Sequence, residues 1–181
     1  GPAYADKADR FGLRFADFVD PAAFAQKLKD TVSYKNTILQ KSFGEEPIDY
    51  DAVLKSYSVY ADRLRPFVAD SVTMVHDVLG QGKRVMFEGA QGSMLDLDHG
   101  TFPYVTSSTT LAGGVCAGAG VGPSAINGVI GIVKAYSTRV GEGPFPTELL
   151  NGTGGLLRTT AHELGATTAR PRPRRGHDTV Q

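Results

Sequence analysis

The sequence contains little that would mark a secreted, membrane-spanning or nucleic-acid-binding protein. It has one cysteine, Cys116, so no internal disulfide framework can form, and a lone thiol suits a reducing cytosol. Nineteen basic side chains balance nineteen acidic ones, so the net charge gives no indication of a nucleic-acid partner. No stretch approaches the roughly 20 apolar residues that a membrane span requires, and we expect no signal peptide. We therefore expect a cytoplasmic protein that binds neither membrane nor nucleic acid.

What the chain does have is glycine, and its distribution divides the sequence. The 181 residues are enough for one ordinary domain, and most of the 22 glycines lie in the second half. We expect a helical segment over about residues 20–82 and a glycine-rich, substrate-binding α/β segment over about residues 83–181. The chain starts at Gly1 instead of Met and stops at Gln181 without a helix stop signal. We expect it to be the central part of a longer, single domain.

Capping residues predict where the helices of the first half begin and end. Asp20 followed by Pro21 predicts a helix start, since the acid caps the free amides and proline suits the first helical position. Apolar residues at helical spacing follow it: Phe24, Leu28 and Val32. Asp51 is predicted to cap a second, longer helix, which Pro66 kinks or interrupts and Gly80 ends.

Two short apolar runs in the second half predict buried β-strands. They cover residues 84–87 and 129–135, and a small-residue helix is predicted between them at residues 109–120. Helices that alternate with buried strands indicate an α/β fold with a mainly parallel sheet and flanking helices. In such sheets ligands gather at the carboxyl ends of the strands, where this chain places glycine and polar residues.

Two motifs behind the first of these strands can bind a nucleotide. Gln91, in a Gly-x-Gln-Gly segment, carries a carboxamide that both donates and accepts hydrogen bonds, which suits a purine or a sugar edge. The hydroxyls of Thr106-Ser107-Ser108 precede a predicted helix start, which suits a phosphate. From the motif alone, an ordinary tight turn is the favoured interpretation of the Gln91 segment. An ordinary helix cap explains Thr106-Ser107-Ser108 as well as a phosphate site does.

Asp96, Asp98 and His99 form the one group that could hold a metal ion. Three ligand-type residues within four positions can bind a divalent cation. A hydrogen-bonded turn accounts for the same spacing, and we favour the turn over a metal site.

Arginines and threonines near the C-terminus suit an anionic ligand. Arg170 and Arg172 lie two residues apart behind Thr167-Thr168, a combination that fits a dicarboxylate. From composition alone a solvated basic tail is the simpler interpretation. Further upstream, the backbone of Val140-Gly141 can approach a ribose because glycine admits close contact.

These segments, with Gly1-Pro2-Ala3-Tyr4 and Gly12-Leu13-Arg14 at the start of the chain, resemble adenylosuccinate synthetase. The resemblance covers nearly the whole chain through long, specific motifs. It implies part of a P-loop-NTPase-like synthetase fold and an enzyme of AMP biosynthesis. That family uses GTP and Mg2+ to join L-aspartate to IMP through 6-phosphoryl-IMP. It also implies a homodimer in which Arg10 reaches the IMP phosphate of the partner subunit.

The resemblance further implies which residues touch each substrate. The IMP-binding residues are Arg10, Gln91, Thr106, Val140, Gly141 and Arg170. The aspartate-binding residues are Ala166, Thr167, Thr168, Ala169, Arg170, Pro171 and Arg172. Arg172 also reaches toward the GTP phosphates. The chain departs from the family pattern at Leu111, at Ala169 in place of glycine, and at His177 in place of tryptophan.

Three family segments are missing from this chain. They are the Gly-Asp-Glu-Gly-Lys-Gly-Lys loop with the catalytic aspartate, the catalytic histidine, and the Lys-Leu-Asp segment that recognises guanine. We therefore place the catalytic residues and the magnesium ligands outside this chain, and expect the chain alone to be inactive. The alternative is a non-catalytic nucleotide- or anion-binding module derived from the family. A nucleic-acid binder using Arg170–Arg175 is a weaker third possibility, since the balanced charge argues against it.

Overall fold

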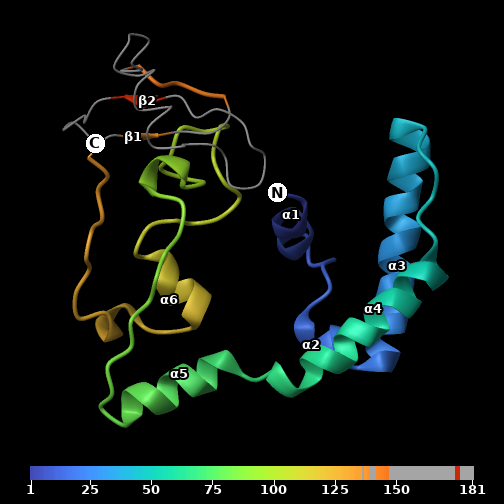
Figure 1. Cartoon of the computed structure of the whole chain (residues 1–181), viewed down its shortest axis with the longest axis horizontal. Coiled ribbons are helices and arrows are strands. Elements are labelled where there is room, and N and C mark those ends of the chain that lie inside the picture. The colour runs from blue at the N-terminus through green and yellow to red at the C-terminus, as the bar shows by residue number, and fades with distance from the viewer. Residues whose placement is uncertain (136, 139–141, 147–173, 176–181) are drawn as a thin grey trace. The chain divides into compact units, whose positions relative to one another are not determined.

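The computed structural model describes residues 1–135, 137–138, 142–146 and 174–175 (Figure 1). They belong to two compact units, Gly1–Val85 and Met86–Gln181, each of which is described by itself. The first unit is helical, and the described part of the second consists largely of turns and loops. Among the described helices, none combines the length and the apolar character that crossing a membrane demands.

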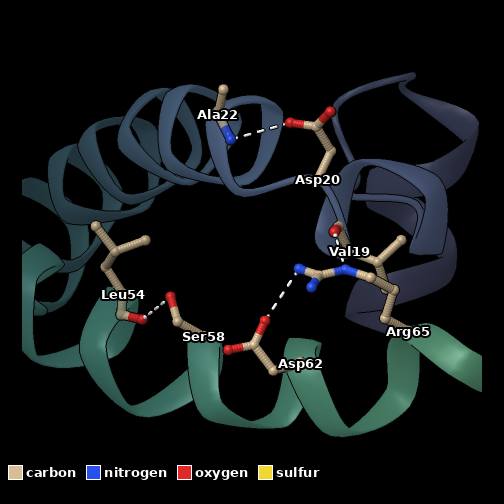
Figure 2. A network of polar contacts seen from close by, with 7 residues as sticks. All are labelled: Val19, Asp20, Ala22, Leu54, Ser58, Asp62 and Arg65. Atoms are coloured by element: carbon tan, nitrogen blue, oxygen red, sulfur yellow. Dashed lines mark hydrogen bonds and ion pairs between the residues drawn. The ribbon is translucent and has the colours of Figure 1, made fainter.

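The helical unit contains two long helices that pack against each other. Its helices are α1 (Pro2–Ala8), α2 (Phe15–Phe18), α3 (Pro21–Ile38), α4 (Tyr50–Leu64) and α5 (Ser71–Gly80) (Figure 1). The predicted start of α3 is confirmed, because the Asp20 carboxylate accepts the amide of Ala22 at 2.9 Å (Figure 2) and that of Ala23 at 2.9 Å. The three apolar residues predicted for this helix, Phe24, Leu28 and Val32, form the buried core. Around them pack Leu13, Phe18, Tyr50, Val53 and Leu54.

The N-cap of the second helix lies two residues earlier than predicted. Asp49, and not Asp51, is the N-cap, and its carboxylate accepts the amides of Asp51 at 2.8 Å and Ala52 at 3.1 Å. A capping side chain bonds the amides of the second and third helical residues. In α4 these are Asp51 and Ala52, so Asp51 lies inside the helix and the prediction that it is the cap was wrong. Asp51 itself occupies the second helical position, where its charge favours the positive end of the helix dipole.

The predicted interruption of the second helix at Pro66 is confirmed. It ends at Leu64, and a single 3-10 turn, Arg65–Phe67, contains Pro66, which lacks the amide needed to continue the helical ladder. Asp70 then caps the separate helix α5. Figure 2 shows how the end of α4 is tied down: the Arg65 side chain donates to the Val19 carbonyl at 3.0 Å and pairs with Asp62 at 3.0 Å.

The second unit has short elements of regular structure. They are a 3-10 turn at Ser93–Leu95, the helix α6 (Gly114–Ala119), a second 3-10 turn at Pro123–Ala125, and the strands β1 (Ser137–Thr138) and β2 (Arg174–Arg175). The two strands pair antiparallel, Ser137 opposite Arg175 and Thr138 opposite Arg174. The helix predicted at residues 109–120 is shorter than expected, because it begins at Gly114 with Gly113 as its N-cap. The prediction that Thr106-Ser107-Ser108 directly precede or cap a helix start was therefore wrong. The helix ends as predicted, at Gly120, which is in the left-handed conformation.

The predicted strands at residues 84–87 and 129–135 are not strands in the described structure. Both segments lack ladder hydrogen bonds. The prediction that they are buried was also wrong, because Met86 is 86 % exposed, Ile130 91 % and Ile132 93 %. A strand exists only when a neighbour accepts and donates its backbone hydrogen bonds, and no such neighbour lies beside these segments in the described part of the chain. The mainly parallel sheet is therefore not confirmed.

Candidate functional site

In the glycine-rich unit, the segment that contains the predicted phosphate-binding residues Thr106-Ser107-Ser108 belongs to one hydrogen-bonded loop. We call residues 92–111 the Asp96 loop, because the carboxylate of Asp96 lies at its centre. Asp96 is 0 % exposed, and among the described residues it is the one buried charged side chain. Its Oδ1 accepts the amides of Asp98 and His99, both at 3.0 Å, and its Oδ2 accepts the amide of Thr110 at 2.7 Å.

The contacts of Asp96 are those of a hydrogen-bonded turn. Its carboxylate accepts the amides of Asp98 and His99, which lie two and three residues further along the chain. The hydrogen-bonded turn predicted for Asp96, Asp98 and His99 is therefore confirmed. Within the described ranges, no group of three or more metal-binding side chains comes together.

Burial and hydrogen bonding act in opposite directions on the pKa of Asp96. Burial, the largest single cause, raises the pKa because it penalises the charged form. The backbone amides of Thr110, His99, Asp98 and Leu111 each lower it, and together they bring the pKa of Asp96 below its ordinary value. The carboxylate is therefore ionised at neutral pH, with backbone dipoles in place of a cationic partner.

Three further hydrogen bonds tie the two halves of the loop together. The two residues that flank Asp96 form backbone hydrogen bonds with the segment 106–108. The Thr106 amide donates to the Leu95 carbonyl at 2.9 Å, and the Leu97 amide donates to the Ser108 carbonyl at 3.3 Å. The Thr110 hydroxyl donates to the Gly92 carbonyl at 2.7 Å. Thr106 thus lies on backbone that is fixed at several points.

Gln91 lies directly before this loop in a turn-forming conformation. Its φ is 67°, a left-handed value that is uncommon for any residue but glycine, and Gly92 follows with φ 140°. The tight turn predicted for this segment is therefore present. The Gln91 side chain is exposed on that turn, where its carboxamide is available to a ligand.

Arg10 lies on a second strained turn, in the helical unit. Its φ is 63°, and the amides of Phe11 and Gly12 behind it both donate to the Asp6 carbonyl at 2.9 Å. The Asp6 carboxylate pairs with Lys35 of α3 at 2.6 Å. The exposed Arg10 is thus carried on a short turn anchored to a long helix. The sequence around Arg10 does not predict the Asp6–Lys35 pair, since the two residues lie far apart in the chain.

The described part of the helical unit also contains an apolar groove of about 310 Å³. Its lining includes Leu13, Phe18, Leu28 and Tyr57, and Arg14 is the one charged residue on it. Such a lining offers packing surface but no acid, base or nucleophile, so the candidate chemistry belongs to the two turns and the Asp96 loop and not to this groove.

The remaining predicted site residues lie outside the described residues. They are Val140, Gly141, Ala166, Thr167, Thr168, Ala169, Arg170, Pro171 and Arg172. Their roles stay predictions. The residue that sequence reasoning undervalued is Asp96, whose local turn was visible in the spacing but whose bond to Thr110, 14 positions away, was not.

Comparison with known proteins identifies the family. The family model described as adenylosuccinate synthetase matches residues 1–180. The chain belongs to the adenylosuccinate synthetase family. The resemblance deduced from the motifs is confirmed.

Relatives within the family are close in sequence and in fold. The adenylosuccinate synthetase of Desulfitobacterium hafniense is 56 % identical over 172 residues, and that of Clostridium botulinum (strain 657) is 55 % identical over the same length. Each match covers 95 % of this chain and 40 % of the relative. A solved structure of fully ligated adenylosuccinate synthetase from Plasmodium falciparum is 38 % identical, with a TM-score of 0.90 over 97 % of this chain and 41 % of that one. The chain thus shares the fold of the corresponding part of a synthetase and spans about two fifths of the length of its relatives.

The hydrogen bonds of Asp96 predict how the loop responds to acid. Because the folded-state pKa lies below the ordinary 3.8, Asp96 contributes stability that is fully present above about pH 3.8. That contribution is lost as pH falls through the folded-state pKa. We expect the Asp96 carboxyl carbon to titrate by NMR with a midpoint below 3.8, and the Thr110 amide to lose protection from exchange over the same range. The Val121 amide, which donates to Cys116, controls for general acid unfolding. A midpoint at or above 3.8 would contradict the bonding described.

A glycine packed inside the loop predicts its sensitivity to a single methyl group. A Cβ on Gly100 would lie 2.5 Å from the Met94 carbonyl oxygen and closer still to that of Asp96. We expect Gly100→Ala to lower the free energy of unfolding by about 1–3 kcal/mol, because the backbone must move. Gly118→Ala in α6 is the matched control: its Cβ meets nothing within 4 Å, so we expect up to about 1 kcal/mol of stabilisation. Urea unfolding of both variants measures this, and equal effects would refute the packing argument.

Proposed function

We propose that this chain is the central part of a GTP-dependent synthetase that joins IMP and L-aspartate to form adenylosuccinate. The observation that carries the proposal is the family match over residues 1–180, together with 56 % identity to a curated synthetase. In the first step the 6-oxygen of IMP attacks the γ-phosphorus of GTP, and GDP leaves. In the second, the amine of aspartate attacks C6 and displaces phosphate, which gives adenylosuccinate.

In this proposal the chain binds IMP and aspartate more than it carries out phosphoryl transfer. Thr106 on the Asp96 loop holds the 5′-phosphate of IMP. Gln91 contacts the purine base of IMP, and the backbone of Val140-Gly141 approaches the ribose. Arg170 contacts aspartate and IMP, and Arg172 contacts aspartate and the GTP phosphates. The hydrogen bonds that fix the loop support the first two roles, since a phosphate site gains from pre-positioned donors. Arg10, exposed on its anchored turn, is proposed to reach the IMP phosphate of a partner subunit in a homodimer.

The magnesium ion of the family does not fit the described residues. Asp96, the best candidate ligand, already accepts backbone amides on both oxygens. We place the Mg2+ ligands, the catalytic aspartate and the catalytic histidine in parts of the protein outside this chain, because the family segments that carry them do not occur in its sequence.

We also propose that the exposed apolar segments complete a mainly parallel sheet of the P-loop-NTPase-like type with strands from the rest of the protein. Residues 129–133 are rich in valine and isoleucine, which favour strands, and their side chains are largely exposed in the chain by itself. An exposed apolar strand is an aggregation hazard unless it is paired or covered. The single cysteine is consistent with a cytoplasmic location.

Turnover tests the proposed activity. We expect the full-length protein to form adenylosuccinate from IMP and aspartate with GTP, detected by its absorbance change and by GDP release. The purified 181-residue chain should not, because the phosphoryl-transfer residues are placed outside it. Turnover by the 181-residue chain would refute that placement, and no turnover by a full-length protein that still binds IMP would favour the non-catalytic binding module.

The aspartate loop can be tested by one arginine. In the full-length protein, Arg170→Leu removes charge-assisted hydrogen bonds to a carboxylate. We expect KM for aspartate to rise roughly 10- to 100-fold, as the loss of about 1.5–3 kcal/mol implies. Arg63→Leu, which removes an exposed arginine of α4, is the control and should leave KM for aspartate unchanged. Unchanged aspartate kinetics in Arg170→Leu would reject its role.

A further inference from the structure

We propose that Asp96 is a positioning residue for the 5′-phosphate of IMP: it holds the backbone that carries Thr106 in the geometry that binds the phosphate. This inference rests on the proposed function, in which Thr106 binds that phosphate. Asp96 itself touches no substrate in this account and acts through the loop around it.

An isolated buried carboxylate is energetically costly. Asp96 is fully withdrawn from solvent, and in the described part of the chain no lysine or arginine pairs with it. Its partners are the backbone amides of Asp98, His99, Thr110 and Leu111. Removing an ionised carboxylate from water is unfavourable unless hydrogen bonds replace the lost hydration. Burial of the Asp96 carboxylate therefore depends on the backbone at residues 98–99 and at Thr110, which must both keep their amides at hydrogen-bonding distance.

Thr106 lies in a segment that is hydrogen-bonded to both sequence neighbours of Asp96. The two residues that flank Asp96 in sequence each bond the predicted phosphate cradle: the Leu95 carbonyl accepts the Thr106 amide, and the Leu97 amide donates to the Ser108 carbonyl. The Asp96 backbone thus lies between two bonds to the segment 106–108. A shift of Asp96 moves both bonds, and with them the Thr106 backbone.

Both oxygens of the Asp96 carboxylate are used as hydrogen-bond acceptors. One oxygen accepts amides within the turn, and the other accepts Thr110 beyond the cradle, so residues 97–109 are closed at both ends by one side chain. An asparagine has one acceptor oxygen and would present its NH2 group to amide donors on the other side. Asp96→Asn must therefore release one end of this segment.

The experiment compares IMP with inosine, which lacks the phosphate. In the full-length protein we expect Asp96→Asn to raise the Kd for IMP about 10- to 100-fold, since a misplacement of about 1 Å can cost a factor of that order. The Kd for inosine, measured by competition, should change less than about twofold, because the lost contact is to the phosphate. Asp49→Asn is the matched control: Asp49 also accepts two backbone amides, at the start of α4, and this variant should change neither Kd.

Each outcome decides the inference. A loss of affinity for IMP and inosine by the same factor would show a structural role only, and an unchanged Kd for IMP would overturn positioning altogether. Should Asp96→Asn fail to fold, Asp96→Glu keeps the charge and both acceptor oxygens but shifts them by one methylene. It should weaken IMP binding several-fold while sparing inosine, and equal effects on both ligands would again overturn the proposal.

Wild-type binding separates this inference from the function on which it rests. A wild-type protein that binds no IMP refutes the proposed function and the positioning role with it. If wild type binds IMP and Thr106→Ala weakens that binding, but Asp96→Asn binds IMP normally, the function stands and the inference about Asp96 fails alone.

Discussion

The organisation of the glycine-rich unit depends on one buried carboxylate, Asp96, held by backbone amides. Its burial opposes ionisation, and the amides of two separate segments more than compensate for that opposition. The interaction is directional, since each oxygen must face its own donors at hydrogen-bonding distance. It therefore fixes the path of the chain through Thr106 in a way that apolar contacts, which have no preferred direction, would not.

The two units are stabilised by different forces. The helical unit has capped helices around a small apolar core of Phe24, Leu28 and Val32. In the described part of the second unit, Val121 is the one buried apolar residue, and polar contacts to the backbone replace a core. Helices thus anchor the Arg10 turn, and backbone hydrogen bonds hold the loop that carries Thr106. Loops on a rigid support commonly carry binding residues.

Local chemistry was predictable where a side chain acts on its own neighbours. Asp20 and Pro21 marked the start of α3, Pro66 marked the break after α4, and the spacing of Asp96, Asp98 and His99 indicated a turn. The cap of α4 was assigned to Asp51, whereas the structure has Asp49 in that position. Residues 84–87 and 129–135 are neither strands nor buried in the described structure, because an apolar run shows only a tendency to be covered and does not indicate where the covering segment lies.

By itself the sequence determined the family, the start of α3 and the candidate residues Gln91, Thr106 and Arg10, because motifs and capping signals depend on residues close together in the chain. Only the tertiary structure decided that Asp96 reaches Thr110, that Leu95 and Leu97 bond the segment containing Thr106, and that Lys35 anchors the turn of Arg10. Those contacts join residues that the sequence separates. They form because a buried charge or amide must find a partner wherever the folded backbone supplies one.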